Sequence, residues 1–320
     1  MKAAAYKKYG PPEVIQILDI PKPMPQDDEV LVRIFASTMN RTDCGFRKPE
    51  YPVIIRAING LLKPRITVLG SEFSGVIEEV GKKVTTFKAG DKVFGMSTKR
   101  FGTHAEYICL PEKSAIAPKP GNMSHEEAAA VCDGLMLASA YINEIDFSRP
   151  VKILINGASG SIGSAAVQLA RYYGASITAV CNTDSMELIK NLGAEKVLDY
   201  TKEDFTRISE TYDIVFDAVG KSSFFKCRRL LNNHGIYFST ELGFLGQNIV
   251  LPIITKLFHG KRAGFPLPQA AKKDIEFYKL LIENGEYRAV IDRVFSLEQA
   301  AEAARYVETG TKTGNVVLKI

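Results

Sequence analysis

Cysteine and histidine are scarce in this 320-residue sequence, and those present are scattered. The five cysteines form no Cys-x-x-Cys pair, and the four histidines, His104, His125, His234 and His259, lie far apart along the chain. Zinc sites draw their ligands mainly from these two residue types, commonly at short characteristic spacings. We therefore expect no metal site. Isolated cysteines also favour free thiols in a reducing compartment over a disulfide framework.

Long apolar runs and concentrated charge are also missing. The first ten residues carry Lys7 and Lys8 where a secretory signal needs an apolar core, and no stretch reaches the ~18 consecutive apolar residues of a membrane span. The net charge of +5 is spread along the chain, and pairs such as Lys82-Lys83 are too short for a nucleic-acid footprint. We expect a cytoplasmic protein that has neither a nucleic acid nor a membrane as its partner.

The pattern of the chain changes near residue 123. Before this point, strand-like runs at residues 29–35 and 75–80 alternate with turns rich in glycine and proline, which predicts a β-rich barrel or sandwich. Ser124 and Glu127 then have the spacing of a capping box and precede an alanine-rich helix. This helix start places the expected domain boundary between residues 123 and 124.

Apolar, β-branched runs alternate with segments of helical composition after residue 150. The runs cover residues 151–155, 177–180, 214–219 and 235–239. This alternation predicts an α/β fold with a doubly wound parallel sheet, covered by helices on both faces. Residues 290–320 have the pattern of strand, helix and strand, and we expect them to complete the first domain. The predicted domains are therefore 1–123 with 290–320, and 124–289.

A glycine-rich turn follows the first of these runs. Gly157, Gly160 and Gly163 separate the strand from a helix-forming segment. Glycine at 160 would let the backbone approach a pyrophosphate, and the helix N-terminus would offer N–H groups and a positive dipole end. Because a second strand follows at the length of a βαβ unit, we interpret the turn as a dinucleotide site rather than a tight connection alone. The expected contacts are Ser159, Gly160, Ser161, Ile162 and Gly163.

The tip of the second strand indicates which nicotinamide cofactor is bound. An acidic residue there would hydrogen-bond the ribose 2′-OH of NADH and repel the 2′-phosphate of NADPH. The sequence instead has Asn182 and Thr183 at this point. We therefore favour NADPH, with both side chains as donors to its 2′-phosphate. The alternative is that the two are only turn residues.

Motifs collinear with those of a known family extend along the whole chain. They read Asn-Arg-Thr-Asp at 40–43, Gly-Ser-Glu-Phe-Ser-Gly at 70–75, Phe-Lys-Ala-Gly-Asp-Lys-Val-Phe at 87–94 and Leu-Gly-Ala at 192–194, together with the glycine-rich turn. The sequence thereby resembles the medium-chain dehydrogenase/reductase superfamily, in its zinc-independent quinone oxidoreductase branch. The resemblance implies a GroES-like β-rich catalytic domain, a Rossmann domain that binds NADP, and a homodimer.

The zinc ligands of the related alcohol dehydrogenases look replaced. By the resemblance, a cysteine ligand corresponds to Asn40 and a histidine ligand to Ser71, and the cysteine-rich structural zinc lobe has no counterpart after Phe94. Without a Lewis acid, an unactivated alcohol is hard to ionise. We therefore expect hydride transfer from NADPH to a quinone or an α,β-unsaturated carbonyl, whose conjugated system delocalises the negative charge.

The resemblance also places further residues near the cofactor and the substrate. Asn40 would donate a hydrogen bond to the substrate oxygen, unless it is only a turn residue before a helix. Tyr51 is the nearby phenol that would act as a proton donor, unless it is a packed aromatic. In the Rossmann domain the expected cofactor contacts are Tyr200, Val219, Gly220, Ser239 and Thr240.

Two other functions stay open. An enoyl-thioester reductase would need positive charge at the mouth of its cleft, which Lys48, Arg56 and Lys63 would supply unless they are simply solvated. A non-catalytic NADPH-binding protein would agree with Met136, which stands where relatives place a threonine near the nicotinamide carboxamide. Turnover tests with a quinone, a small enone and an enoyl thioester separate these alternatives.

Overall fold

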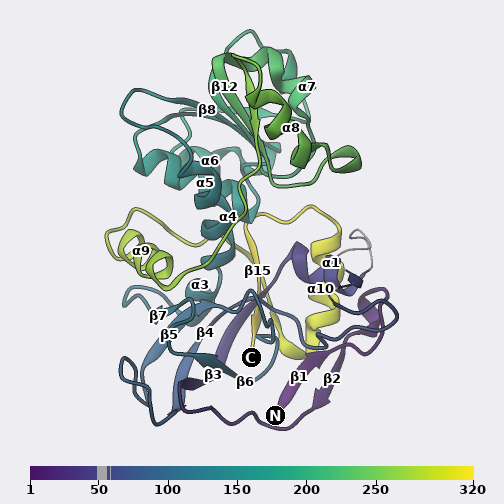
Figure 1. Cartoon of the computed structure of the whole chain (residues 1–320), viewed down its shortest axis with the longest axis vertical. Coiled ribbons are helices and arrows are strands. Elements are labelled where there is room, and N and C mark those ends of the chain that lie inside the picture. The colour runs from purple at the N-terminus through teal and green to yellow at the C-terminus, as the bar shows by residue number, and fades with distance from the viewer. Residues whose placement is uncertain (49–55, 58) are drawn as a thin grey trace. The chain divides into compact units, whose positions relative to one another are not determined.

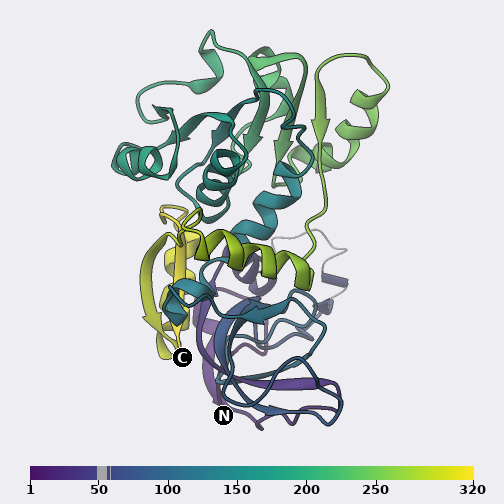
Figure 2. The same cartoon turned by 90° about the vertical axis from the view of Figure 1, so that its left-hand side faces the viewer.

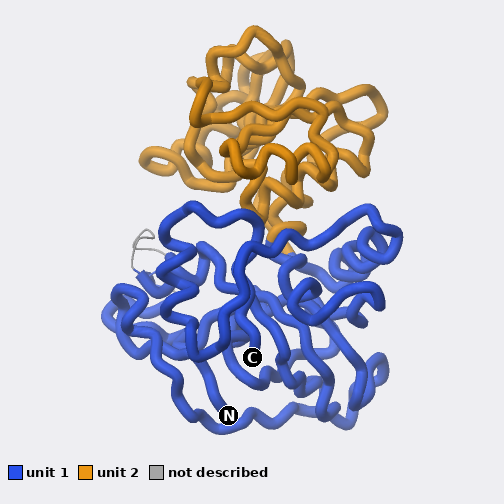
Figure 3. The backbone as a smooth tube through the Cα atoms, turned by 180° about the vertical axis from the view of Figure 1, so that it is seen from behind, with its two compact units in different colours: residues 1–133, 270–320 blue, residues 134–269 orange. Residues whose placement is uncertain are grey.

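The computed structural model describes residues 1–48, 56–57 and 59–320 (Figure 1). The chain forms two compact units, which are coloured separately in Figure 3. The first unit consists of Met1–Asp133 and Ala270–Ile320, and the second of Gly134–Gln269. The expected boundaries, after residues 123 and 289, differ from these.

A mainly antiparallel sheet forms the frame of the first unit. Its strands are β3 (Glu29–Met39), β4 (Glu72–Val80), β5 (Lys92–Met96), β6 (Tyr107–Pro111), β7 (Ile116–Pro118), β14 (Ile291–Ser296) and β15 (Asn315–Lys319). Their order is β14-β15-β3-β4-β5-β7, with β6 also paired to β3. Because β15 pairs with β3, the C-terminal segment completes this sheet. β1 (Lys2–Ala5) and β2 (Gln16–Asp19) form a separate antiparallel pair.

The helices of the first unit explain where the observed boundaries fall. They are α1 (Arg41–Arg47), α3 (His125–Ala129), α9 (Lys272–Glu283), shown side-on in Figure 2, and α10 (Ala300–Glu308), with the short 3-10 helices η1 (Pro12–Val14) and η6 (Leu297–Gln299). α3 packs against β3 and β4, and α9 packs against β7. A capping box such as that of Ser124 marks where a helix starts, but not which core the helix joins. Both helices join the first core, so the boundaries lie at 133 and 270.

The second unit is a six-stranded parallel sheet with helical connections (Figure 1). Its strands are β8 (Lys152–Asn156), β9 (Ser176–Cys181), β10 (Lys196–Asp199), β11 (Tyr212–Asp217), β12 (Leu231–Ser239) and β13 (Arg262–Gly264), in the order β10-β9-β8-β11-β12-β13. The helices are α4 (Cys132–Ile142), which begins before the unit boundary, α5 (Ser161–Tyr172), α6 (Met186–Leu192), α7 (Phe224–Cys227) and α8 (Gln247–Lys256), with η2 (Thr183–Ser185), η3 (Phe205–Arg207), η4 (Arg228–Leu230) and η5 (Phe244–Gly246). The predicted α/β class with a doubly wound parallel sheet is confirmed. The strand order reverses between β8 and β11, where sheets of this kind bind ligands.

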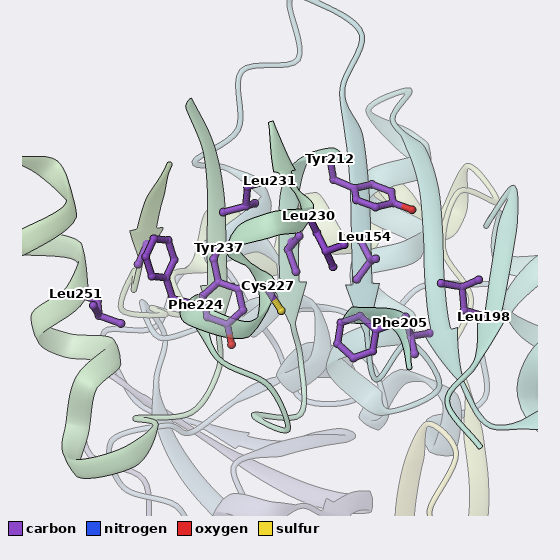
Figure 4. Close-up of a cluster of buried hydrophobic side chains, with 13 residues drawn as sticks. Leu154, Leu198, Phe205, Tyr212, Phe224, Cys227, Leu230, Leu231, Tyr237 and Leu251 are labelled. Carbon is purple, nitrogen blue, oxygen red and sulfur yellow. The ribbon is translucent and has the colours of Figure 1, made fainter. Parts of the chain in front are cut away.

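A cluster of large apolar side chains packs beside the parallel strands of the second unit (Figure 4). It includes Leu154 on β8, Tyr237 on β12 and Leu251 on α8, all nearly inaccessible to water. Burial of such a side chain stabilises the fold by roughly 1.5–3 kcal/mol. The cluster therefore fixes one side of α8 firmly against the sheet.

No helix in the described part of the chain is both long and apolar enough to cross a bilayer.

Candidate active site

The glycine-rich turn joins β8 to α5 at the carboxyl end of the parallel sheet. Gly157 has a φ of +77°, and a Cβ there would lie 2.3 Å from the side chain of Val219. A Cβ on Gly163 would lie 2.1 Å from the carbonyl oxygen of Gly157. The turn itself therefore requires both glycines, because a side chain at either position would collide with its neighbours.

Gly160 has a different environment. It is the N-cap of α5, with a φ of −73°, and no side chain caps this helix. A Cβ at this position would meet one neighbouring atom within 4 Å, the carbonyl oxygen of Gly157 at 3.6 Å. The twelve-residue α5 adds the positive end of its dipole to this uncapped first turn. The backbone here consequently fits a pyrophosphate.

The ends of β11 and β12 lie at the same edge of the sheet. Asp217, the last residue of β11, is fully buried and accepts hydrogen bonds from backbone N–H groups of the next loop, that of Val219 at 3.3 Å among them. The N–H of Thr240 donates to the Asp217 carbonyl oxygen at 3.2 Å. The structure thus brings the predicted residues Val219, Gly220, Ser239 and Thr240 together with the glycine-rich turn.

An acidic side chain that the sequence pattern did not reveal stands at the tip of β9. The register of β10 pairs Asp199 with Cys181, the residue before Asn182. Thr183 donates its hydroxyl to the Asp199 carboxylate, and Thr201 donates its N–H at 2.9 Å and its hydroxyl at 2.7 Å. These hydrogen bonds, that from Thr183 foremost, lower the pKa of Asp199 to about 2. The carboxylate is therefore ionised at neutral pH.

Polar groups surround this carboxylate. The Nζ atom of Lys202 lies 3.4 Å from it, and the neighbouring Tyr200 is 58% exposed. The Oδ1 atom of Asn182 is buried and has no hydrogen-bond partner among the residues that the structure describes. A half-turn of the amide exchanges its oxygen and nitrogen, so this group can accept or donate. Asn182 thus retains hydrogen-bonding capacity for a ligand, whereas the Thr183 hydroxyl, predicted to donate to a 2′-phosphate, already donates its hydrogen to Asp199.

Asn40 begins α1 in the first unit. Its Oδ1 accepts a hydrogen bond from the Asp43 N–H at 3.0 Å, and its own N–H donates to Asp43 Oδ2 at 2.9 Å, which completes a capping box. Its Nδ2 donates to Ser71 Oγ at 3.2 Å. The interpretation as a residue before a helix therefore agrees with the structure. Because an amide has two Nδ2 hydrogens, donation to a substrate stays a prediction beside it.

A buried acidic cluster adjoins Ser71. Glu72 is inaccessible to water and accepts hydrogen bonds from the Thr38 hydroxyl and, at 2.7 Å, from the N–H of Asp133. Burial raises the pKa of both the Glu72 and the Asp133 carboxyl, and the nearby charge of Asp133 raises that of Glu72 further. This cluster therefore retains protons at a pH where exposed carboxyl groups have lost them.

Comparison with known proteins identifies the family. Residues 26–121 match the alcohol dehydrogenase GroES-like domain, and residues 192–318 match the zinc-binding dehydrogenase family. Over 99% of its length the chain is 32% identical to 2-methylene-furan-3-one reductase of Solanum lycopersicum, of which the match covers 79%. The chain belongs to the medium-chain dehydrogenase/reductase superfamily. It falls in the quinone oxidoreductase-like branch, as the sequence motifs indicated.

Other members of this superfamily support the assignment. The NADPH-dependent alkenal/one oxidoreductase of Arabidopsis thaliana, a chloroplastic protein, is 31% identical over 99% of this chain and 79% of its own. The quinone oxidoreductase of Coxiella burnetii has a TM-score of 0.89 and 28% identity, and the match covers 100% of this chain and 99% of that one. The predicted GroES-like and Rossmann domains are thereby confirmed, and the chain is an oxidoreductase.

By the resemblance of the sequence motifs, the metal ligands of zinc-dependent superfamily members would correspond to Asn40 and Ser71. An amide and a hydroxyl that hydrogen-bond each other are not the thiolate and imidazole that zinc prefers. In the described ranges, no group of three or more His, Cys, Asp or Glu side chains is placed to hold a metal ion. The amide of Asn40 and the hydroxyl of Ser71 do not fit zinc, and independence from zinc stays a prediction. Tyr51, the predicted proton donor, lies outside the described residues.

Proposed function

We propose that this oxidoreductase uses NADPH, without zinc, to reduce quinones or α,β-unsaturated carbonyls. The observation that supports this most directly is the hydrogen bond of 3.2 Å from Asn40 to Ser71, at the positions of the metal ligands in zinc-dependent relatives. Without a Lewis acid the acceptor must delocalise its own developing charge. The names of relatives agree, because they include a 2-methylene-furan-3-one reductase and a quinone oxidoreductase.

The second unit supplies the groups that would hold the cofactor. The uncapped first turn of α5, at Gly160, would bind the pyrophosphate, and the loop at Val219 and Gly220 would lie along the ribose. NADPH bound at this edge supplies a hydride. In sum, NADPH, a proton and an enone give NADP⁺ and the saturated ketone. The amide of Asn40 would donate to the substrate oxygen and stabilise the negative charge that develops there.

The tip of β9 supports NADPH in spite of Asp199. The carboxylate already accepts hydrogen bonds from Thr183 and Thr201, so it is poorly placed to accept another from a ribose 2′-OH. Lys202, 3.4 Å away, offsets its charge and offers a cation to a 2′-phosphate. The Arabidopsis relative is itself named as NADPH-dependent.

Substitution of Lys202 tests the choice of cofactor. In Lys202→Ala we expect the Kd of NADPH to rise about fivefold or more, because a phosphate–lysine contact contributes on the order of 1 kcal/mol, while the Kd of NADH changes little. Lys196→Ala is the matched control, since Lys196 pairs with Glu210 on the surface. Equal loss of affinity for both cofactors, or tighter binding of NADH by the unmodified protein, would contradict the assignment.

A substrate panel tests the reaction class. We expect NADPH to be oxidised by a quinone or a small enone, at a rate that a metal chelator does not change. Activity that is lost with the chelator, or that appears only with a saturated alcohol and NADP⁺, would overturn the zinc-independent mechanism. Preference for an enoyl thioester would instead select the thioester reductase, and tight NADPH binding with no turnover would select the non-catalytic binding protein.

The homodimer and the cytoplasmic location remain predictions. The first rests on the resemblance and the second on the composition and the N-terminal residues. Sedimentation velocity over a range of protein concentrations would test the homodimer, and fractionation of the source cells would test the location.

A further inference from the structure

The helix α8 in the second unit has an apolar side that faces water. Its buried side consists of Asn248, Leu251 and Thr255, and the Thr255 hydroxyl oxygen accepts a hydrogen bond of 3.0 Å from the Ala263 N–H of β13. The opposite side, continued by the turn that follows, carries six exposed apolar residues. We call it the α8 face; its residues and exposed fractions are Ile249 51%, Val250 50%, Ile253 68%, Ile254 45%, Leu257 77% and Phe258 68%.

The α8 face is one continuous stripe. Its residues recur at intervals of four, so that Ile249, Ile253 and Leu257 form one row and Val250, Ile254 and Phe258 form the next. A helix on the surface of a globular protein normally presents polar residues on its outer side. A contiguous exposed apolar surface of this kind marks an interaction site.

The charged residues of the segment that carries the α8 face have one sign. Residues 242–273 contain no aspartate or glutamate, whereas Lys256, Lys261 and Arg262 follow or flank the stripe. Lys261 donates a hydrogen bond to the carbonyl oxygen of Arg228 at 3.0 Å, which brings a further cationic residue to the same region. Two copies of the chain that met through this face would bring these cations together without an acid from this segment to pair with them. An anionic surface would complement them.

We propose that the α8 face docks this protein on an anionic lipid surface. The helix would lie in the plane of the interface, with its apolar residues at the boundary of the acyl chains and Lys256, Lys261 and Arg262 against the lipid phosphates. This differs from the expectation that no membrane is a partner, which rested on the lack of a membrane-spanning run. An interfacial helix needs no such run, because a single apolar side is sufficient. The docking is independent of the proposed reaction.

Vesicle co-sedimentation of the full chain tests the docking. The protein is mixed with vesicles of phosphatidylcholine alone, or of phosphatidylcholine with phosphatidylglycerol, and the bound fraction is measured at low and high salt. We expect binding to the mixed vesicles that weakens as salt screens the charges, and much weaker binding to phosphatidylcholine alone. Equal binding to the two kinds of vesicle, or no binding to either, would overturn the proposal.

Matched variants separate the apolar and the cationic contributions. Ile253→Gln with Leu257→Gln removes apolar area without adding charge, and should lower partitioning more than about tenfold. Its control is Met24→Gln with Leu62→Gln, two exposed apolar residues of the first unit, 85% and 91% accessible. Lys256→Gln with Arg262→Gln should lower binding to anionic vesicles by about fivefold per charge, the factor that corresponds to about 1 kcal/mol for each basic residue.

Two further measurements keep the result unambiguous. Far-UV circular dichroism and the unfolding temperature of each variant show that a loss of binding does not come from a loss of fold. Sedimentation velocity shows whether the α8 face is instead a contact between copies. The protein could form a dimer that dissociates in Ile253→Gln with Leu257→Gln and could fail to bind anionic vesicles. That result would assign the α8 face to a contact with a second copy and reject the lipid surface.

Discussion

The glycines of the cofactor turn have different roles, and alanine at each position should separate stability from binding. Gly163→Ala places a Cβ 2.1 Å from the Gly157 carbonyl oxygen, so it should lower the free energy of unfolding by about 1–3 kcal/mol. Gly160→Ala meets only an ordinary contact at 3.6 Å, so it should unfold like the unmodified protein while its Kd for NADPH rises at least about tenfold. Chemical denaturation and cofactor titration give both quantities. Gly121→Ala, with no neighbour within 4 Å, should change neither.

The buried carboxyl of Glu72 should make stability depend on pH. Burial raises its pKa in the folded state above the ordinary value of 4.5, so the folded chain keeps a proton that the unfolded chain releases. Its favourable contribution is complete below pH 4.5 and is lost as the pH rises through the folded-state pKa. Glu72→Gln cannot ionise, and its unfolding temperature should therefore fall less between weakly acidic and alkaline pH. Glu203→Gln, at the surface, should retain the full dependence; a Glu72 variant that behaves the same way would contradict the assignment.

At the scale of single elements, the sequence pattern predicted the long strands of the parallel sheet but not the register in which the short strand β10 pairs. β8, β9 and β11 contain β-branched, apolar runs, so their pattern is distinct. β10 is only four residues long, and the register that pairs Asp199 with Cys181 depends on tertiary packing. Asp199 thus lies at the tip of β9 although it belongs to a different strand, so the residues at the end of β9 alone do not predict an acid there. The glycine-rich turn was predictable because strand, turn and helix are contiguous in sequence.

The connection between α1 and α10 should depend on one buried ion pair. Arg47 is 1% exposed, donates to the Gly10 carbonyl oxygen at 2.6 Å and pairs with Glu308 of α10. Arg47→Ala would leave the half-buried acceptors of Gly10 and Glu308 without this donor and should destabilise the first unit by about 2 kcal/mol. Arg305 on the same helix pairs with Glu13, but both are more than half exposed, so Arg305→Ala should cost under about 1 kcal/mol. Thermal unfolding gives the unfolding temperature of each variant. Equal decreases in the two variants would show that burial of the arginine does not determine how much stability is lost.

At the scale of the whole molecule, the predicted nucleotide contacts are confined to the second unit, although the catalytic candidate Asn40 is in the first. The fragment 2′,5′-ADP carries the adenosine and the 2′-phosphate of NADPH but no nicotinamide, so it should engage only the second unit. In hydrogen exchange measured by mass spectrometry we expect it to protect residues 157–163 and 182–202, because ligand binding raises the free energy of local opening. Peptides from β3 and β4 should exchange unchanged.

The matched ligand is 5′-AMP, which differs from 2′,5′-ADP only in lacking the 2′-phosphate and should protect residues 157–163 while protecting 182–202 less. That difference isolates the contribution of Asn182 and Lys202 from the contribution of the α5 N-terminus. Protection by 5′-AMP equal to that by 2′,5′-ADP at residues 182–202 would mean that the tip of β9 does not bind the 2′-phosphate. Protection confined to the first unit would place the nucleotide elsewhere and remove the basis of the proposed reaction.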